Sequence, residues 1–128
     1  MSTLEQQRAQ AAWQMVKDAQ QEAERAEWSF KDYVNTCKGL PALIMTSGLM
    51  QTMAFLEQKK KRHRFIGQQI RTWLHQRYGY AQEFEQFMQQ MFKADSATYQ
   101  KVNGEIYALL KWLRQFAAAK ASTEQTGD

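Results

Sequence analysis

The chain contains few side chains that bind metals or act as nucleophiles. Its two histidines, His63 and His75, are far apart in the sequence, and Cys37 is its one cysteine. A metal site needs several converging ligands, and a nucleophile needs a base beside it, so these residues could cooperate only if the tertiary fold happened to join them. We therefore expect no enzyme activity, no metal site and no cofactor. A small enzyme that uses His63, His75 and Cys37 together is kept as a remote alternative.

Basic side chains are the stronger candidates for ligand binding, and they gather in the middle of the chain. The formal net charge is +4, but residues 38–80 carry eight basic side chains against the single acidic Glu57, while both flanking parts are net negative. Lysine and arginine on a helix face neutralise phosphates without reading base sequence. The same pattern would also suit a solvated corner between helices that only adds solubility, so the charge alone leaves both interpretations open.

The composition favours a single all-α domain. The 128 residues include one proline and six glycines, too few breakers for an all-β fold. We expect a compact helical bundle of about five to six helices over residues 1–119, followed by a flexible C-terminal tail at 120–128.

A long N-terminal helix over about 3–38 is predicted by apolar residues at alternating spacings of three and four from Ala9 to Cys37. Ser2 and Glu5 could form a capping box at its start. Gly39 could end it, because glycine readily adopts the left-handed conformation at a helix C-terminus.

Four further helical segments follow in the sequence. Pro41 suits the first turn of a helix over about 42–59, and Gly48 suggests a break or kink within it. The later helices are expected at about 62–78, at 81–93, and from a cap at Asp95 or Ser96 onward.

The helix at 62–78 is expected to carry a basic stripe opposite its apolar face, because Lys61, Arg64, Gln68, Arg71 and His75 fall on one side at 100° per residue. The predicted phosphate contacts are Lys59, Lys60, Lys61, Arg62, Arg64 and Arg71, with Lys38, Lys111 and Arg114 as weaker candidates.

Two segments resemble a known family. The first segment spans Leu40 to Leu56 and begins with LPALIMTSGL. The second spans Tyr99 to Ala117 and ends with ALLKWLRQFA. Together they resemble the small α-helical subunit family of type III-B CRISPR (Cmr) effector complexes. Ser47 departs from the family pattern, which usually has asparagine there. The resemblance implies an all-helical, non-enzymatic subunit, several copies of which stack beside the backbone subunits that hold the guide RNA.

The resemblance, together with the basic surface, predicts a structural subunit that contacts the backbones of guide RNA and target RNA. Its expected partners are other copies of itself and the backbone and large subunits of the effector complex. We expect a cytoplasmic protein without a membrane partner, since the lone cysteine suits a reducing compartment and the sequence has no apolar run of about 20 residues. The alternative is a helical adaptor that binds only protein, through an acidic patch on its partner.

Overall fold

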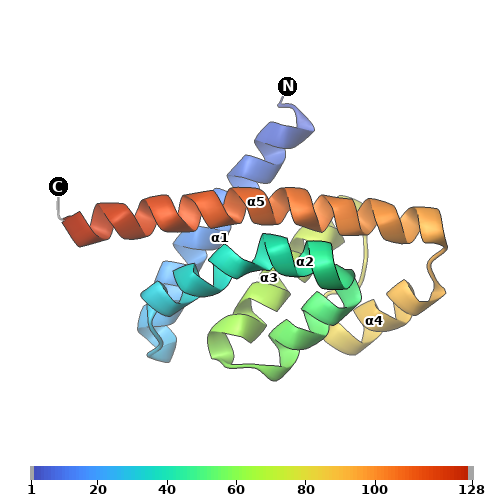
Figure 1. Ribbon diagram of the computed structural model, residues 1–128, viewed down its shortest axis with the longest axis horizontal. Coiled ribbons are helices and arrows are strands. Elements are labelled where there is room, and N and C mark those ends of the chain that lie inside the picture. The colour runs from blue at the N-terminus through green and yellow to red at the C-terminus, as the bar shows by residue number, and fades with distance from the viewer. Residues whose placement is uncertain (1, 127–128) are drawn as a thin grey trace.

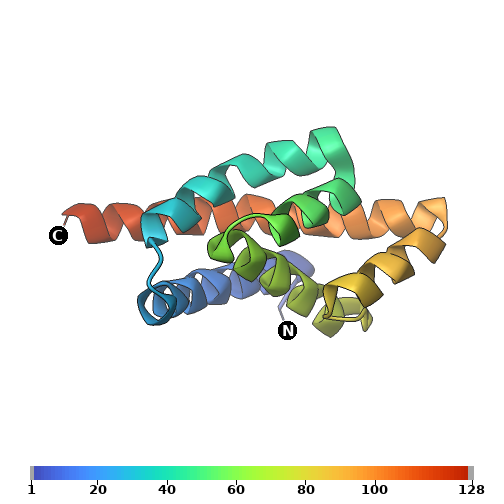
Figure 2. The same ribbon diagram turned by 90° about the horizontal axis from the view of Figure 1, so that it is seen from below.

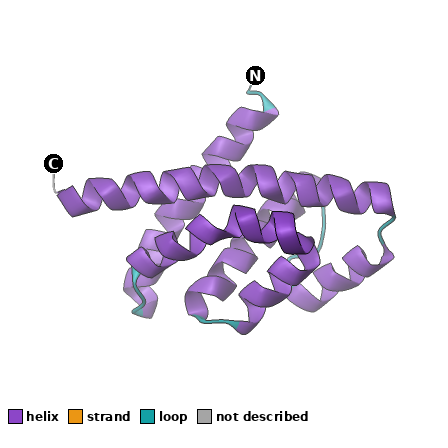
Figure 3. Ribbon diagram, viewed as in Figure 1, coloured by secondary structure: helices purple, strands orange, loops and turns teal. Residues whose placement is uncertain are grey.

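The computed structural model describes residues 2–126, and within that range the chain folds into helices without strands (Figures 1 and 3). The predicted all-α class is therefore confirmed. The helices are α1 (Leu4–Ala26), α2 (Phe30–Gln58), α3 (Lys61–Tyr78), α4 (Phe84–Lys93) and α5 (Ser96–Thr126).

The long helix α5 is the central element of the bundle. It lies between α2 on one side and α1 on the other, and α3 packs against α2 and α1 (Figure 2). Its buried face includes Ile106, Leu109, Leu110 and Leu113, none of which exposes any surface. Burying such side chains is the main source of stability in a domain of this size.

The single N-terminal helix predicted over 3–38 is wrong, because the chain turns at residues 27–29. Glu27 adopts the left-handed conformation (φ 60°, ψ 46°) and ends α1, and the Trp28 N–H donates to the Ala23 carbonyl at 3.0 Å. Ser29 then caps α2, its hydroxyl accepting from the Asp32 N–H. A non-glycine residue in this conformation costs about 1–2 kcal/mol. The packing of Trp28 on Tyr33 and Phe65 offsets that cost.

Gly39 and Pro41 do not separate two helices as expected, since both lie inside α2. The neighbouring side chains of Cys37, Leu40 and Ile44 are buried in the core, and this packing keeps the segment helical. The helix is broken instead at Gly48 (φ 81°, ψ 170°), as the sequence suggested. There the Tyr99 hydroxyl from α5 accepts the Met50 N–H at 3.4 Å.

The remaining helix ends agree with the sequence in part. The capping box at the start of α1 is formed by Thr3 and Gln6 rather than by Ser2 and Glu5. Asp95 caps α5 by accepting the Thr98 N–H at 2.7 Å. Because α5 continues to Thr126, most of the segment expected as a tail at 120–128 is helical; residues 127–128 lie outside the described residues.

Helix α2 is long and apolar enough to cross a membrane by length and composition alone, with a mean hydropathy of 1.3 over its most apolar window. A core helix of a globular protein passes the same test. In this fold its apolar side packs in the core, where Tyr33, Leu49, Met53 and Leu56 are fully buried.

Candidate nucleic-acid interface

The turn between α2 and α3 carries the densest group of exposed cations in the predicted set. In Figure 1 this turn lies at the edge of the molecule away from α5. Lys59, Lys60, Lys61 and Arg64 are all exposed, and none of them makes an ion pair with a carboxylate whose side chain the structure describes. The ammonium of Lys59 lies 5.4 Å from the centre of the Phe55 ring. We call these four residues the basic corner.

The first turn of α3 adds to the positive potential of the basic corner. Lys60 occupies the capping position but provides no side-chain acceptor, and the first turn contains no acidic residue. The free N–H groups and the helix dipole therefore remain uncompensated at this end, which favours a negatively charged ligand.

Arg62 belongs to the same turn but is only partly available. Its Nε donates to the Thr36 hydroxyl at 3.2 Å, and Nη1 lies 3.8 Å from the Asp32 carboxylate. The side chain is 20% exposed. Arg62 therefore ties the start of α3 to α2, and a phosphate would compete with Asp32 for it.

Arg71 does not lie on an exposed stripe, so the predicted stripe is interrupted after Gln68. Its side chain is 3% exposed. Its Nε donates to the Gln82 carbonyl at 2.6 Å, Nη2 is 3.7 Å from Glu57, and the guanidinium stacks over Phe84. The helical periodicity predicted a single buried face for α3, whereas the segment that leads into α4 covers a second side of this helix. Burial lowers the pKa of Arg71, and only Glu57 and Glu83 oppose that effect.

The three residues with potential for chemistry occupy separate environments. His63 is buried edge-on against Phe55, and burial, reinforced by the neighbouring cations, lowers its pKa. His75 is exposed, with Nδ1 2.8 Å from the Tyr80 carbonyl oxygen. Cys37 is buried, which raises the pKa of its thiol. Among the described residues, no three His, Cys, Asp or Glu side chains are placed to hold a metal ion.

Two of the three weaker candidates, Lys111 and Arg114, lie on a different surface from the basic corner. Lys38 is exposed on α2, and Lys111 and Arg114 are exposed on α5. Lys111 and Arg114 line a shallow hollow with Pro41 and Tyr107, and the Lys111 ammonium lies over the Tyr107 ring. The structure thus brings Lys111 and Arg114 together, but away from the groove that Lys61 and Arg64 line.

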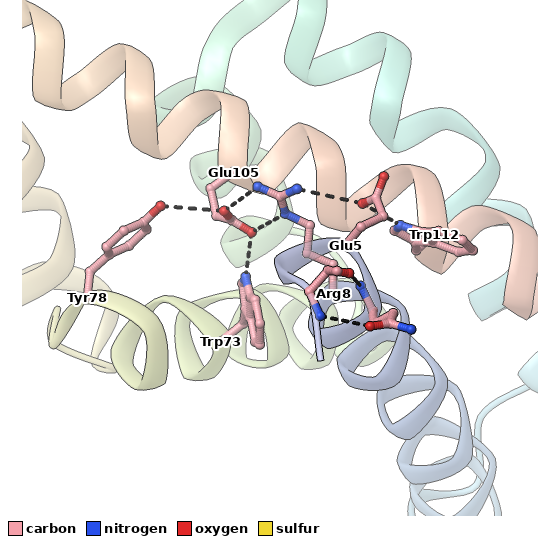
Figure 4. A network of polar contacts seen from close by, with 8 residues as sticks. Glu5, Arg8, Trp73, Tyr78, Glu105 and Trp112 are labelled. Carbon is pink, nitrogen blue, oxygen red and sulfur yellow. Dashed lines mark hydrogen bonds and ion pairs between the residues drawn. The ribbon is translucent and has the colours of Figure 1, made fainter. Parts of the chain in front are cut away.

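The structure also reveals a buried polar network centred on Glu105, which sequence reasoning missed (Figure 4). Arg8 donates to both carboxylate oxygens at 2.8 Å, and the Trp73 Nε1 donates at 3.0 Å. Arg8 also lies 3.6 Å from Glu5, which accepts the Trp112 Nε1 at 2.9 Å. The network joins α1, α3 and α5.

The network lowers the pKa of Glu105. Burial by itself would raise that pKa, but the hydrogen bonds from Arg8 and Trp73 outweigh it and lower the pKa below the ordinary value. One signal was present in the sequence: Glu105 stands three residues after Val102 and four before Leu109, on the apolar face of the helix. A carboxylate at such a position requires a partner.

The comparisons with known proteins agree on one family. The model of the CRISPR-associated protein family Cas_Cmr5 matches residues 4–120. The chain belongs to this family. It is 28% identical over 120 residues to the CRISPR system Cmr subunit Cmr5 of Thermus thermophilus, covering 93% of this chain and 96% of that protein.

A solved structure is also similar, the X-ray crystal structure of a CRISPR-associated Cmr5 family protein from Thermus thermophilus. It superposes with a TM-score of 0.73 at 28% identity, covering 93% of this chain and 97% of that one. The two segments that carry the sequence resemblance lie within α2 and α5, and they meet where the Tyr99 hydroxyl lies against the break at Gly48.

Proposed function

We propose that this chain is a non-catalytic structural subunit of a type III-B CRISPR Cmr ribonucleoprotein, contacting the backbone of guide or target RNA through the basic corner. Family membership supports the assembly, because a relative with nearly the same length bears the name of a Cmr subunit. The observation that supports RNA contact is the basic corner itself, four exposed cations around an uncapped helix start.

The proposed roles differ from residue to residue. Lys59, Lys60, Lys61 and Arg64 neutralise phosphates directly, and each contact releases condensed counterions. Arg62 contributes when a phosphate displaces Asp32. Arg71 does not contact RNA; its role is to hold the segment at Gln82 against α3. Lys38, Lys111 and Arg114 are assigned a second, weaker contact on α2 and α5. Copies of the chain stack beside the backbone subunits, and this stacking buries surface side chains such as Met45, which is 68% exposed in the single chain.

A salt titration with single-stranded RNA tests the RNA contact. Four phosphate contacts predict that the logarithm of the binding constant falls against the logarithm of the salt concentration with a slope of about −3. In the double variant Lys61→Glu/Arg64→Glu, the slope becomes shallower by more than one and affinity in low salt drops. The control is Lys17→Glu/Lys93→Glu, which reverses the same charge at exposed positions on α1 and α4.

Binding that responds equally to both double variants would show that the basic corner has no special role. No RNA affinity in low salt, for the free chain and for the assembled complex alike, would favour the protein-only adaptor. Copurification with the other Cmr subunits checks assembly independently of RNA affinity.

A further inference from the structure

An open groove of about 660 Å³ lies beside the basic corner, and the RNA-contact proposal does not yet use it. One wall comes from the end of α1 and the turn that follows it, and the other from the end of α2 and the first half of α3. The volume falls in the range of small-ligand sites. The lining residues are Glu22, Arg25, Ala26, Glu27, Trp28, Glu57, Lys61, Arg64, Phe65 and Gln68.

The carboxylates of the groove lie on both walls. Glu22 and Glu27 stand at the end of α1, and Glu57, at the end of α2, lies 3.7 Å from Arg71 of α3. Lys61 and Arg64 stand on the α3 wall, exposed and without a carboxylate partner among the described side chains. The charge of Arg25 on the α1 wall is balanced by Glu22, which accepts a hydrogen bond of 2.9 Å from the Arg25 Nε. Glu27 adds a further carboxylate, so this wall is net negative. The lining as a whole carries three cations and three carboxylates. A bare anion is therefore a poor match for the whole groove.

Two aromatic rings lie between these walls. The ring centres of Trp28 and Phe65 are 6.0 Å apart at an interplanar angle of 53°, and both rings are half-buried. Trp28 is fixed from behind by stacking on Tyr33 at 6.0 Å and 20°. Both rings line the groove, although Trp28 and Phe65 each also border a neighbouring hollow. A flat ligand in the groove would therefore meet preformed apolar surface without reordering the rings.

From these features we propose that the groove binds an unpaired nucleobase of the RNA, while the phosphate of the same nucleotide lies on Lys61 and Arg64. A nucleotide matches the groove because its base is planar and its phosphate is anionic. The ring packs on Trp28 and Phe65, and the base N–H donors face the carboxylates of Glu27 and Glu57. This inference rests on the proposed RNA contact and adds a base-binding subsite to it.

The test compares two oligomers of equal length and charge, single-stranded oligocytidylate and an abasic ribose-phosphate chain, binding to the full-length protein. Stacking of one base contributes about 1–3 kcal/mol, so oligocytidylate should bind between about fivefold and about 150-fold more tightly than the abasic chain. Both Phe65→Leu and the milder Trp28→Phe should reduce that ratio while leaving affinity for the abasic chain unchanged. Phe92→Leu, which removes an exposed ring on α4 outside the groove, should leave the ratio intact.

The possible failures are distinguishable. Equal binding of the two oligomers would overturn the base subsite and leave the phosphate contacts of the basic corner standing. A preference for oligocytidylate that survives both groove variants, or that disappears in Phe92→Leu, would also overturn it by placing the stacking elsewhere. Binding of neither oligomer would remove the proposed RNA contact and this subsite with it. Far-ultraviolet circular dichroism of each variant confirms that the helices are retained.

Discussion

Replacing Glu105 with glutamine should destabilise the protein by about 3 kcal/mol. Glu105 is 3% exposed and accepts two hydrogen bonds from Arg8, one from Trp73 and a longer one, 3.5 Å, from the Tyr78 hydroxyl. Glutamine keeps one acceptor oxygen but turns an amide N–H₂ toward a donor, and it leaves the guanidinium with only the exposed Glu5, 3.6 Å away, as a counter-charge. Breaking a buried ion pair in this way costs about 3–5 kcal/mol. We place the value at the lower end because Arg8 is 20% exposed and water can reach it.

Urea unfolding followed by circular dichroism at neutral pH measures this change. The matched control is Glu24→Gln, the same chemical change at an exposed position on α1, which should alter the free energy of unfolding by less than about 0.5 kcal/mol. The double variant Arg8→Met/Glu105→Leu removes both charges together. It should recover part of the loss, because an apolar pair of similar volume replaces a buried ion pair at little cost, while the Trp73 Nε1–H loses its acceptor.

Acidification gives a second view of the same group. Because the pKa of Glu105 is lowered in the folded state, the unfolded chain binds more protons between that value and the ordinary 4.5. The stabilisation is therefore fully present above about pH 4.5 and is lost as the pH falls through the folded-state pKa. The stability difference between the native chain and Glu105→Gln should narrow over that range. Equal stability of the two proteins at neutral pH would refute the account of the network.

Two backbone predictions concern the turn and the break that interrupt the predicted helices. Gly48→Ala should lower the free energy of unfolding by about 2–3 kcal/mol, because φ 81°, ψ 170° is essentially restricted to glycine. The control is Gly39→Ala, in open space within the same helix, which should raise the free energy of unfolding by about 0.5–1 kcal/mol. Equal effects of the two substitutions in thermal unfolding would contradict the backbone geometry at Gly48. Glu27→Gly should stabilise slightly, by about 0.5 kcal/mol, by relieving the left-handed conformation. The same change at Glu24, inside α1, should destabilise by about 1 kcal/mol, and the opposite order would show that α1 does not end at Ala26.

The sequence alone predicted the features that depend on neighbours a few residues apart. The all-α class, the extent of α3, a cap at Asp95 or Ser96 and a break or kink at Gly48 all follow from helical periodicity, capping side chains and glycine, which act over about four residues. The concentration of positive charge at 38–80 is likewise a property of the chain, and in the fold it places four exposed cations on the turn between α2 and α3.

Tertiary structure decided what depends on segments that are distant in the sequence. The turn at Glu27 overrides an unbroken apolar periodicity, because Trp28 packs against Phe65 of α3 and the chain must fold back to allow it. Arg71 is buried because the segment at Gln82 covers the side of α3 that a helical wheel assigns to solvent. Glu105 finds its partner in Arg8, 97 residues earlier. A helix pattern shows which side chains share a face, but only the packing of the other helices determines how many of its faces are covered.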